Sequence, residues 1–128
     1  MGRAFTVAAV QAAYVLMDRE ATTDRVEQLI GTAAGQGAEL IVFPEVFVPG
    51  SPIWIDSVPI WDGDEAWFAR LVDQAVVVPS PTTERIAAAA EDAGAYVVAR
   101  RASRLCRPPQ LRDGSVPAAA RVLNEGSE

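Results

Sequence analysis

The chain of 128 residues contains no histidine and one cysteine, and all 11 of its basic residues are arginine. The absence of histidine excludes Ser-His-Asp catalysis, imidazole general bases and most zinc sites. The absence of lysine excludes Schiff-base chemistry and phosphate-binding loops of the GxxxxGK[ST] type. The chemistry open to this chain is therefore narrow, and we expect no metal ion and no cofactor.

Long apolar segments are also absent, since no run approaches the roughly 18 residues of a membrane span. A single cysteine cannot form an internal disulfide, which fits a reducing cytoplasm. The length allows one domain, and a hydrophobic fraction of 50% indicates a folded interior. We thus expect a cytoplasmic globular protein that binds neither membranes nor nucleic acid.

The apolar residues that are present follow alternating strand and helix patterns. The predicted strands are residues 5–12, 39–43 and 95–98, and the predicted helices are residues 20–34, 65–76 and 81–93. Asp18 or Thr22 can cap the first helix, Gly35 or Gly37 can end it, and Ser80 can cap the last. Short right-handed crossovers between the strands imply parallel pairing. The predicted fold class is α/β, with helices covering one face of the sheet.

Residues 39–50 read ELIVFPEVFVPG, in which a short apolar run stops at Pro44 and is followed by Glu45. Because proline cannot donate to a strand ladder, the run is typical of a buried strand that ends there. An acid just beyond such a strand lies at its carboxyl end, where open α/β sheets bind ligands. Glu45 is therefore our candidate catalytic residue, and a solvated glutamate in a turn is the alternative.

A long loop rich in proline and aromatic residues leaves directly from Glu45 and covers residues 46–64. Loops of this length inside compact domains are usually functional or linkers. Its side chains are expected to wall the space around the carboxylate, and Ser51 and Trp54 are our candidates for a substrate pocket. The alternative is that Trp54 and Trp61 cover the core or a subunit contact.

The segment ELIVFPEVFVPG, together with the strand-like TVAAVQAA and the helical segment before it, resembles the N-terminal part of the nitrilase branch of the carbon-nitrogen hydrolase superfamily. The resemblance covers residues 5–98 and implies the N-terminal half of a four-layer αββα sandwich in a homo-oligomer. It also implies a small-molecule nitrile or amide substrate. The glutamate of the family's FPE motif is the general base of a Glu-Lys-Cys triad, and Glu45 matches it. Ser51 stands where the family commonly carries tyrosine.

The family's lysine and nucleophilic cysteine come from later segments that we do not find in this sequence. Cys106 follows Glu45 too closely and lies in RLCRPP, unlike the family's Cys-Trp-Glu context, so we interpret it as an incidental thiol. The resemblance thus implies a truncated nitrilase, whose whole form converts a nitrile to a carboxylic acid and ammonia, and which is inactive alone. The alternative is a non-catalytic α/β binding or assembly module.

The sequence changes character near residue 99. Residues 1–99 hold 14 acidic residues and 5 arginines, a net charge of −9, whereas residues 100–128 hold 3 acidic residues and 6 arginines, a net charge of +3. Periodicity is lost at the same place. We interpret residues 1–99 as a partial hydrolase domain and residues 100–128 as an Arg-rich tail that is disordered or read out of frame. The alternative is a basic tail for an acidic partner or nucleic acid, although no aromatic residue lies among its arginines for base stacking.

Overall fold

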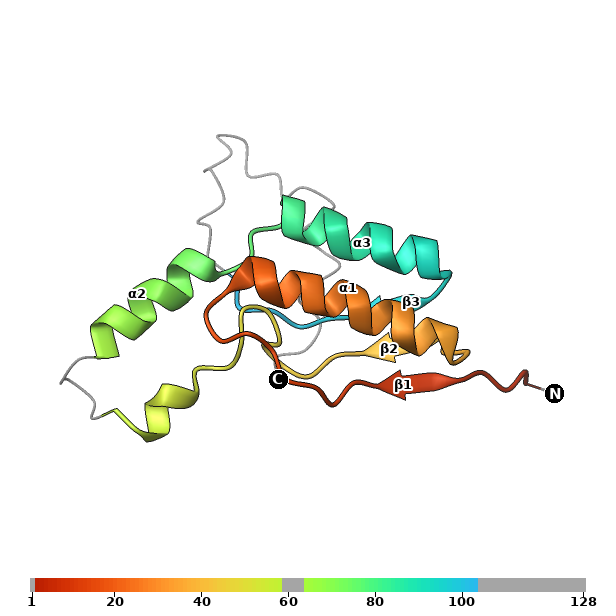
Figure 1. Ribbon diagram of the computed structural model, residues 1–128, viewed down its shortest axis with the longest axis horizontal. Helices are drawn as coiled ribbons and strands as arrows, with labels where there is room; N and C mark the ends of the chain where they lie inside the picture. Colours follow the sequence, from red (N-terminus) through yellow and green to blue (C-terminus); the bar gives the residue numbers. More distant parts are fainter. Residues whose placement is uncertain (1, 59–63, 104–128) are drawn as a thin grey trace, which may run out of the picture.

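The computed structural model describes residues 2–58 and 64–103 (Figure 1). The elements in chain order are β1 (Val7–Ala9), α1 (Arg19–Gly35), β2 (Leu40–Val42), the 3-10 helix η1 (Ile53–Asp56), α2 (Asp64–Gln74), α3 (Pro81–Ala93) and β3 (Tyr96–Val98). Every predicted strand and helix is present. The strands are shorter than predicted, and the long loop contains η1.

The three strands form a parallel sheet in the order β1-β2-β3, with β2 in the centre. Ala8, Ile41 and Val97 are aligned across it. Helices α1 and α3 lie on the same face of the sheet, as right-handed crossovers in one direction require (Figure 1). The predicted α/β class, the parallel pairing and the single helical layer on the sheet are confirmed.

The helix ends agree with the capping residues in the sequence. Asp18 caps α1, because its carboxylate accepts a hydrogen bond of 2.9 Å from the backbone N–H of Ala21. Gly37, with a φ of 87°, takes the left-handed conformation just after this helix. Ser80 and Thr83 form a capping box at the start of α3.

The hydrophobic core lies between the sheet and its two helices. Val26 and Ile30 of α1 are fully buried against Ile41 of β2. Phe47 and Val48, which follow β2, belong to the same cluster. The core therefore extends from the centre of the sheet to the turn that carries Glu45.

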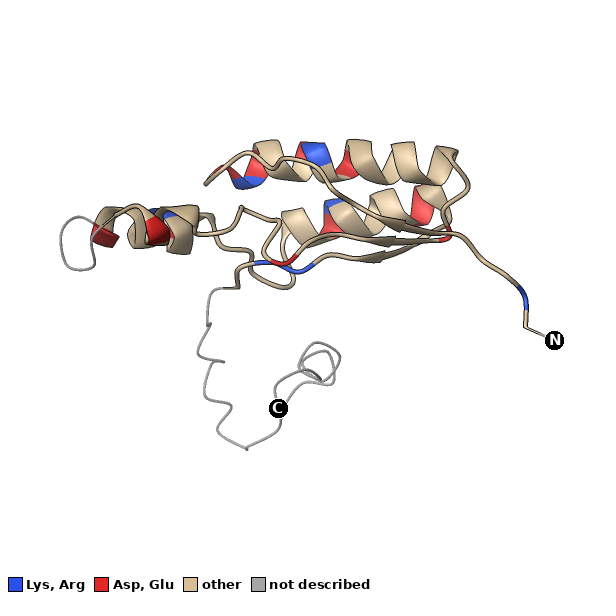
Figure 2. Ribbon diagram, turned by 90° about the horizontal axis from the view of Figure 1, so that it is seen from below, with Lys and Arg blue, Asp and Glu red and all other residues tan. Residues whose placement is uncertain are grey.

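The opposite face of the sheet has no cover among the residues that the structure describes. We call it the open face; by strand alternation it carries Val7, Ala9, Leu40, Val42, Tyr96 and Val98. Val7 is 50% exposed, Val98 48% and Tyr96 81%. All three strands lack charged residues, which gather on the helices (Figure 2). Parallel strands are normally buried on both faces, so this sheet is only half covered.

Helix α2 stands apart from the sheet, together with η1 (Figure 1). None of its residues is buried, and it packs against η1. The sequence led us to expect three helices over the sheet, so this expectation is wrong for α2. Its apolar residues contact Trp54 instead of the core.

The chain continues to pair after β3. The Phe47 N–H donates to the Arg100 carbonyl at 3.2 Å, and the Ala102 N–H donates to the Val48 carbonyl at 3.0 Å. Residues 100–103, which begin the predicted tail, are thus attached to the body by backbone hydrogen bonds. Cys106 and the rest of that tail lie outside the described residues. Across the described segments, no helix is both long enough and apolar enough to span a bilayer.

Candidate active site

Glu45 lies at the carboxyl end of the central strand, as its sequence context predicts. The Phe43 N–H still donates to the Val98 carbonyl at 2.8 Å, Pro44 then interrupts the ladder, and pairing resumes at Phe47. Glu45 begins the turn that follows. The carboxylate thus occupies the edge of the sheet at which open α/β folds bind ligands.

The turn around Glu45 has a constrained backbone. Val46 has a φ of 50°, which is an unfavourable conformation for a β-branched residue. Such strain persists only where the surroundings hold it, and it clusters at functional sites. Phe47 holds this turn against the core. Its buried ring packs edge-on against Tyr14, with ring centroids 5.8 Å apart, and in a tilted arrangement against Phe43, with centroids 5.3 Å apart. The backbone of Glu45 is therefore fixed from the core side.

The Glu45 carboxylate itself faces solvent beside one arginine. Its Oε1 lies 3.5 Å from Nη1 of Arg100, and the two side chains are 68% and 65% exposed. An ion pair this exposed contributes about 0–1 kcal/mol, so it does not lock the carboxylate. Arg100 was not expected beside Glu45 from the sequence alone. The available signal was its position two residues after β3, at the same edge of the sheet as Glu45.

Ser51 and Trp54, the two pocket candidates, have different surroundings. Ser51 is half-buried, and its carbonyl accepts a hydrogen bond of 2.7 Å from the Ile53 N–H. Trp54 is 5% exposed. Its ring stacks on that of Trp67 of α2, with ring centroids 5.5 Å apart, and forms a T-shaped contact with the ring of Phe68. The indole Nε1 of Trp54 is buried without a hydrogen-bond partner within the described segments.

Gly50 sets the path of the loop between Glu45 and Ser51. It has a φ of 111°, and a Cβ atom at this position would lie 2.6 Å from the Tyr14 ring. Any other residue would therefore be strained and would displace Tyr14, which also packs on Phe47. This glycine couples the loop to the turn that holds Glu45.

The chemistry of the site rests on one solvated carboxylate that can accept a proton. Within residues 2–58 and 64–103, no group of three or more histidine, cysteine or acidic side chains is placed to hold a metal ion. The chain contains no lysine, and its one cysteine lies outside these residues. A thiol or amine nucleophile is therefore not among the described side chains.

Comparison with known proteins identifies the class. The carbon-nitrogen hydrolase pattern matches residues 6–116. An aliphatic nitrilase from Rhodococcus rhodochrous is 42% identical over 96 residues, 73% of this chain and 26% of that protein. A nitrilase from Pseudomonas syringae pv. syringae is 43% identical over 94 residues, 72% of this chain and 27% of that protein. An arylacetonitrilase from Aspergillus oryzae is 37% identical over 92 residues, 72% of this chain and 27% of that protein.

The chain therefore belongs to the carbon-nitrogen hydrolase family. Within that family it is an N-terminal fragment of the nitrilase branch, as its sequence resemblance implies. It spans about a quarter of the length of these curated relatives. The family match also extends beyond residue 99, where the sequence alone suggests a boundary.

Proposed function

We propose that this chain carries the general-base part of a nitrile-hydrolysing site, with Glu45 as the base. The observation that supports this most is the placement of Glu45, on a constrained turn at the carboxyl end of β2 with its carboxylate open to solvent. In the resembling family the whole protein converts a nitrile, or an amide, with water to a carboxylic acid and ammonia. No cofactor or metal takes part in the proposed reaction.

By that resemblance, the carboxylate of Glu45 takes the proton of a cysteine thiol. The resulting thiolate attacks the nitrile carbon, and a lysine ammonium stabilises the negative charge that develops on the nitrogen. Water then releases the carboxylic acid, and the nitrogen leaves as ammonia. Glu45 would be the only one of these three groups that this chain supplies.

The chain should therefore be inactive alone, because groups that act as one catalytic unit lose most of their effect when two are removed. We also propose that Ser51 and Trp54 shape the substrate side of the loop, and that Ser51 makes this pocket differ from the family's usual tyrosine. The further proposals are a cytoplasmic location, a four-layer αββα sandwich in the whole protein, and self-association into a homo-oligomer.

An ammonia assay tests the inactivity directly. The purified chain should release no more ammonia from aliphatic or aromatic nitriles than its Glu45→Ala variant does. Turnover that disappears in a Cys106→Ser variant would contradict the proposal and would make the C-terminal residues functional. The nucleotide sequence after codon 98, read in all three frames, tests the truncation: we expect lysine and Cys-Trp-Glu-like segments in another frame.

A chimera tests the role of Glu45. Residues 1–99 of this chain would be joined to the remaining three quarters of the Pseudomonas syringae nitrilase. We expect ammonia release that falls by about a thousandfold or more in Glu45→Gln, because the general base is lost. Glu39→Gln is the matched control, since this carboxylate lies before β2, pairs with Arg3 and should not affect the rate. Full activity in Glu45→Gln would contradict the assignment.

A second candidate function is a non-catalytic binding or assembly module. The open face supports it, because an exposed apolar sheet surface is typical of an interaction site. The chimera discriminates between the two candidates, since a module that only assembles would release ammonia at the same rate in Glu45→Gln as in the unchanged chimera.

A further inference from the structure

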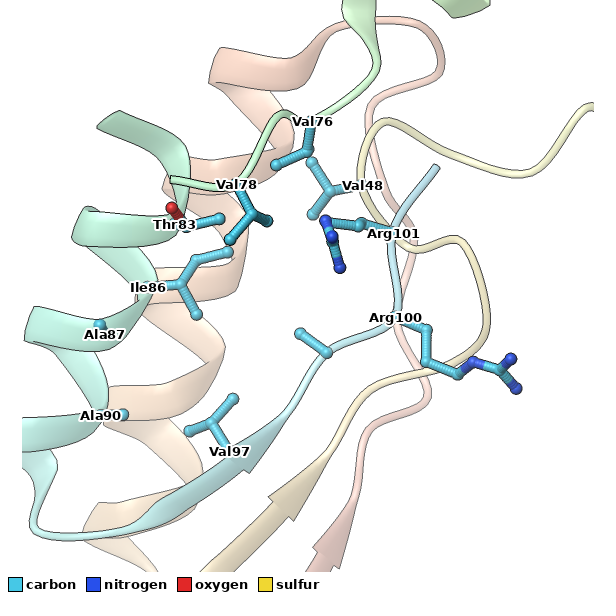
Figure 3. Close-up of a pocket in the computed structure, with 11 residues that line it drawn as sticks. Val48, Val76, Val78, Thr83, Ile86, Ala87, Ala90, Val97, Arg100 and Arg101 are labelled. Atoms are coloured by element: carbon cyan, nitrogen blue, oxygen red, sulfur yellow. The ribbon is translucent and has the colours of Figure 1, made fainter. Parts of the chain in front are cut away.

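A cavity of about 320 Å³ lies between α3, the end of β3 and the segment that leads from α2 to α3 (Figure 3). Its wall is largely apolar, with Val48, Val78, Ile86 and Val97 prominent in it. Small-molecule sites usually measure about 300–1,000 Å³, so this cavity suits a small ligand. Glu45 is not among its lining residues, but Arg100, which pairs with Glu45, contributes to the wall, so the cavity adjoins the candidate active site without including its carboxylate.

One guanidinium group enters this apolar space. Figure 3 shows the side chain of Arg101 directed into the cavity, whereas that of Arg100 points away from it. The Nε of Arg101 is buried and has no hydrogen-bond partner among residues 2–58 and 64–103. Within the described segments, no carboxylate forms an ion pair with Arg101, while Arg100 pairs with Glu45. A buried donor without an acceptor is unfavourable, so a ligand that supplies an acceptor would be stabilised here.

Besides the two arginines, Thr83 is the one lining residue with a polar side chain, and its hydroxyl is already used. The Thr83 hydroxyl donates to the Ser80 carbonyl at 2.9 Å and accepts from the Ser80 N–H at 2.9 Å, as part of the capping box of α3. It has no free proton for a ligand. Recognition of a polar group in the cavity therefore depends on Arg101.

We propose that this cavity binds a small carboxylate with an apolar body. The carboxylate would accept hydrogen bonds from the Arg101 guanidinium, and the body would pack against Ile86 and Val97. A single planar guanidinium matches the charge and the two-oxygen geometry of a carboxylate, whereas a dianionic phosphate requires further donors. The site does not depend on the activity proposed for Glu45.

Phenylacetate and its neutral analogue phenylacetamide test the proposal, because they differ little in shape but differ in charge. Each would be titrated into the full chain and followed by ligand-detected NMR. We expect phenylacetate to bind at least about tenfold more tightly, since a charge-assisted hydrogen bond is lost in the amide. Equal binding of the two compounds, or no binding of either, would overturn the proposal.

Two arginine variants locate the interaction. Arg101→Gln should remove the preference for phenylacetate, whereas Arg100→Gln should leave it unchanged, because that side chain points out of the cavity. If Arg101→Gln does not fold, Arg101→Lys keeps the charge without the planar fork and should reduce the preference only in part. An equal loss in Arg100→Gln and Arg101→Gln would show nonspecific attraction to the arginines and would overturn the site.

A cavity-filling variant tests the location of the apolar body. Ala90 lines the cavity from α3, and Ala90→Leu would occupy part of the space. Both phenylacetate and phenylacetamide should then bind more weakly, while the melting transition of the protein is retained. Undiminished binding in this folded variant would place the ligand elsewhere and contradict the proposal.

Discussion

The two faces of the sheet carry similar apolar side chains in very different surroundings. Ile41 is fully buried beneath α1 and α3, whereas Val98, on the neighbouring strand and the other face, is 48% exposed. The cover of the first face comes from helices that connect consecutive strands, so it is local in sequence. The open face has no such local cover. The comparison shows that a βαβ segment can complete one side of its sheet by itself, and that the other side depends on chain that is remote or on another molecule.

The energetic consequence follows from the exposed area. Burial of apolar surface contributes about 25 cal/mol per Å², so the open face supplies only part of the stabilisation that its residues could give. Uncovered apolar surface and unpaired strand edges also favour association. Both effects can be measured by comparing matched substitutions on the two faces.

The largest expected effect is on the covered face. Ile41→Ala should lower the free energy of unfolding by about 2–5 kcal/mol, because it removes a fully buried side chain and leaves a cavity. Val98→Ala should cost less than about 1 kcal/mol, because half of that side chain is already in water. Urea unfolding followed by circular dichroism gives both values from the shift in midpoint.

Val48→Ala is the matched control, because it makes the same deletion as Val98→Ala at a residue that is 1% exposed. It should be clearly more destabilising than Val98→Ala. If the two valine variants lose equal stability, the open face is covered in solution, and the contrast between the faces is wrong.

The second effect concerns the surface properties of the open face. Replacing Val7 and Val98 together with threonine keeps the shape and the strand propensity but adds two hydroxyl groups. Binding of anilinonaphthalene sulfonate and the scattered light intensity should both fall several-fold. The control replaces Val15 and Val72, which are 45% and 54% exposed elsewhere, and should change neither signal to the same extent. Equal decreases in both double variants would remove the open face as the cause.

The sequence predicted the elements and the covered face well because both depend on local signals. Apolar spacing predicted the helix at residues 20–34, whose Val26 and Ile30 lie in the core. Asp18, one of two candidates, and Ser80 were expected as helix caps, and both cap their helices. The orientation of α2 was not predictable, because its apolar residues have the same spacing as those of a helix that covers a sheet. Only the contact of Trp54 with this helix shows where they pack.

The candidate site was predictable to a similar degree. Glu45 was identified because proline ends a strand, which is a local rule. The proximity of Arg100 depends on the register of β3 against β2, and the strain at Val46 depends on the packing of Phe47. Both are tertiary features, for which the sequence contains no periodic signal.

A third prediction concerns the polar side of the helical layer. Arg85 of α3 donates hydrogen bonds to Glu27 and Asp24 of α1 and lies 3.3 Å from Glu20. Arg85→Gln should lower the free energy of unfolding by about 0.5–1 kcal/mol, and less at high salt, because the network is partly exposed. The side-chain hydrogen bonds to Glu27 and Asp24 raise the pKa of Arg85. A raised pKa stabilises the fold at every pH below the ordinary arginine range, so no loss is expected between neutral and mildly alkaline pH. Salt-dependent urea unfolding checks the value.

The smallest effect is expected near the open face, at a second place where an ion pair joins distant segments of the chain. Arg3 pairs with Glu39, and their side chains are 81% and 41% exposed. Arg3→Gln should leave the unfolding midpoint unchanged, because an exposed pair gains little and orders a flexible side chain. A midpoint shift as large as that of Arg85→Gln would mean that Arg3 is desolvated in solution. The open face beside it would then be covered, and the difference between the two faces would be smaller than the structure indicates.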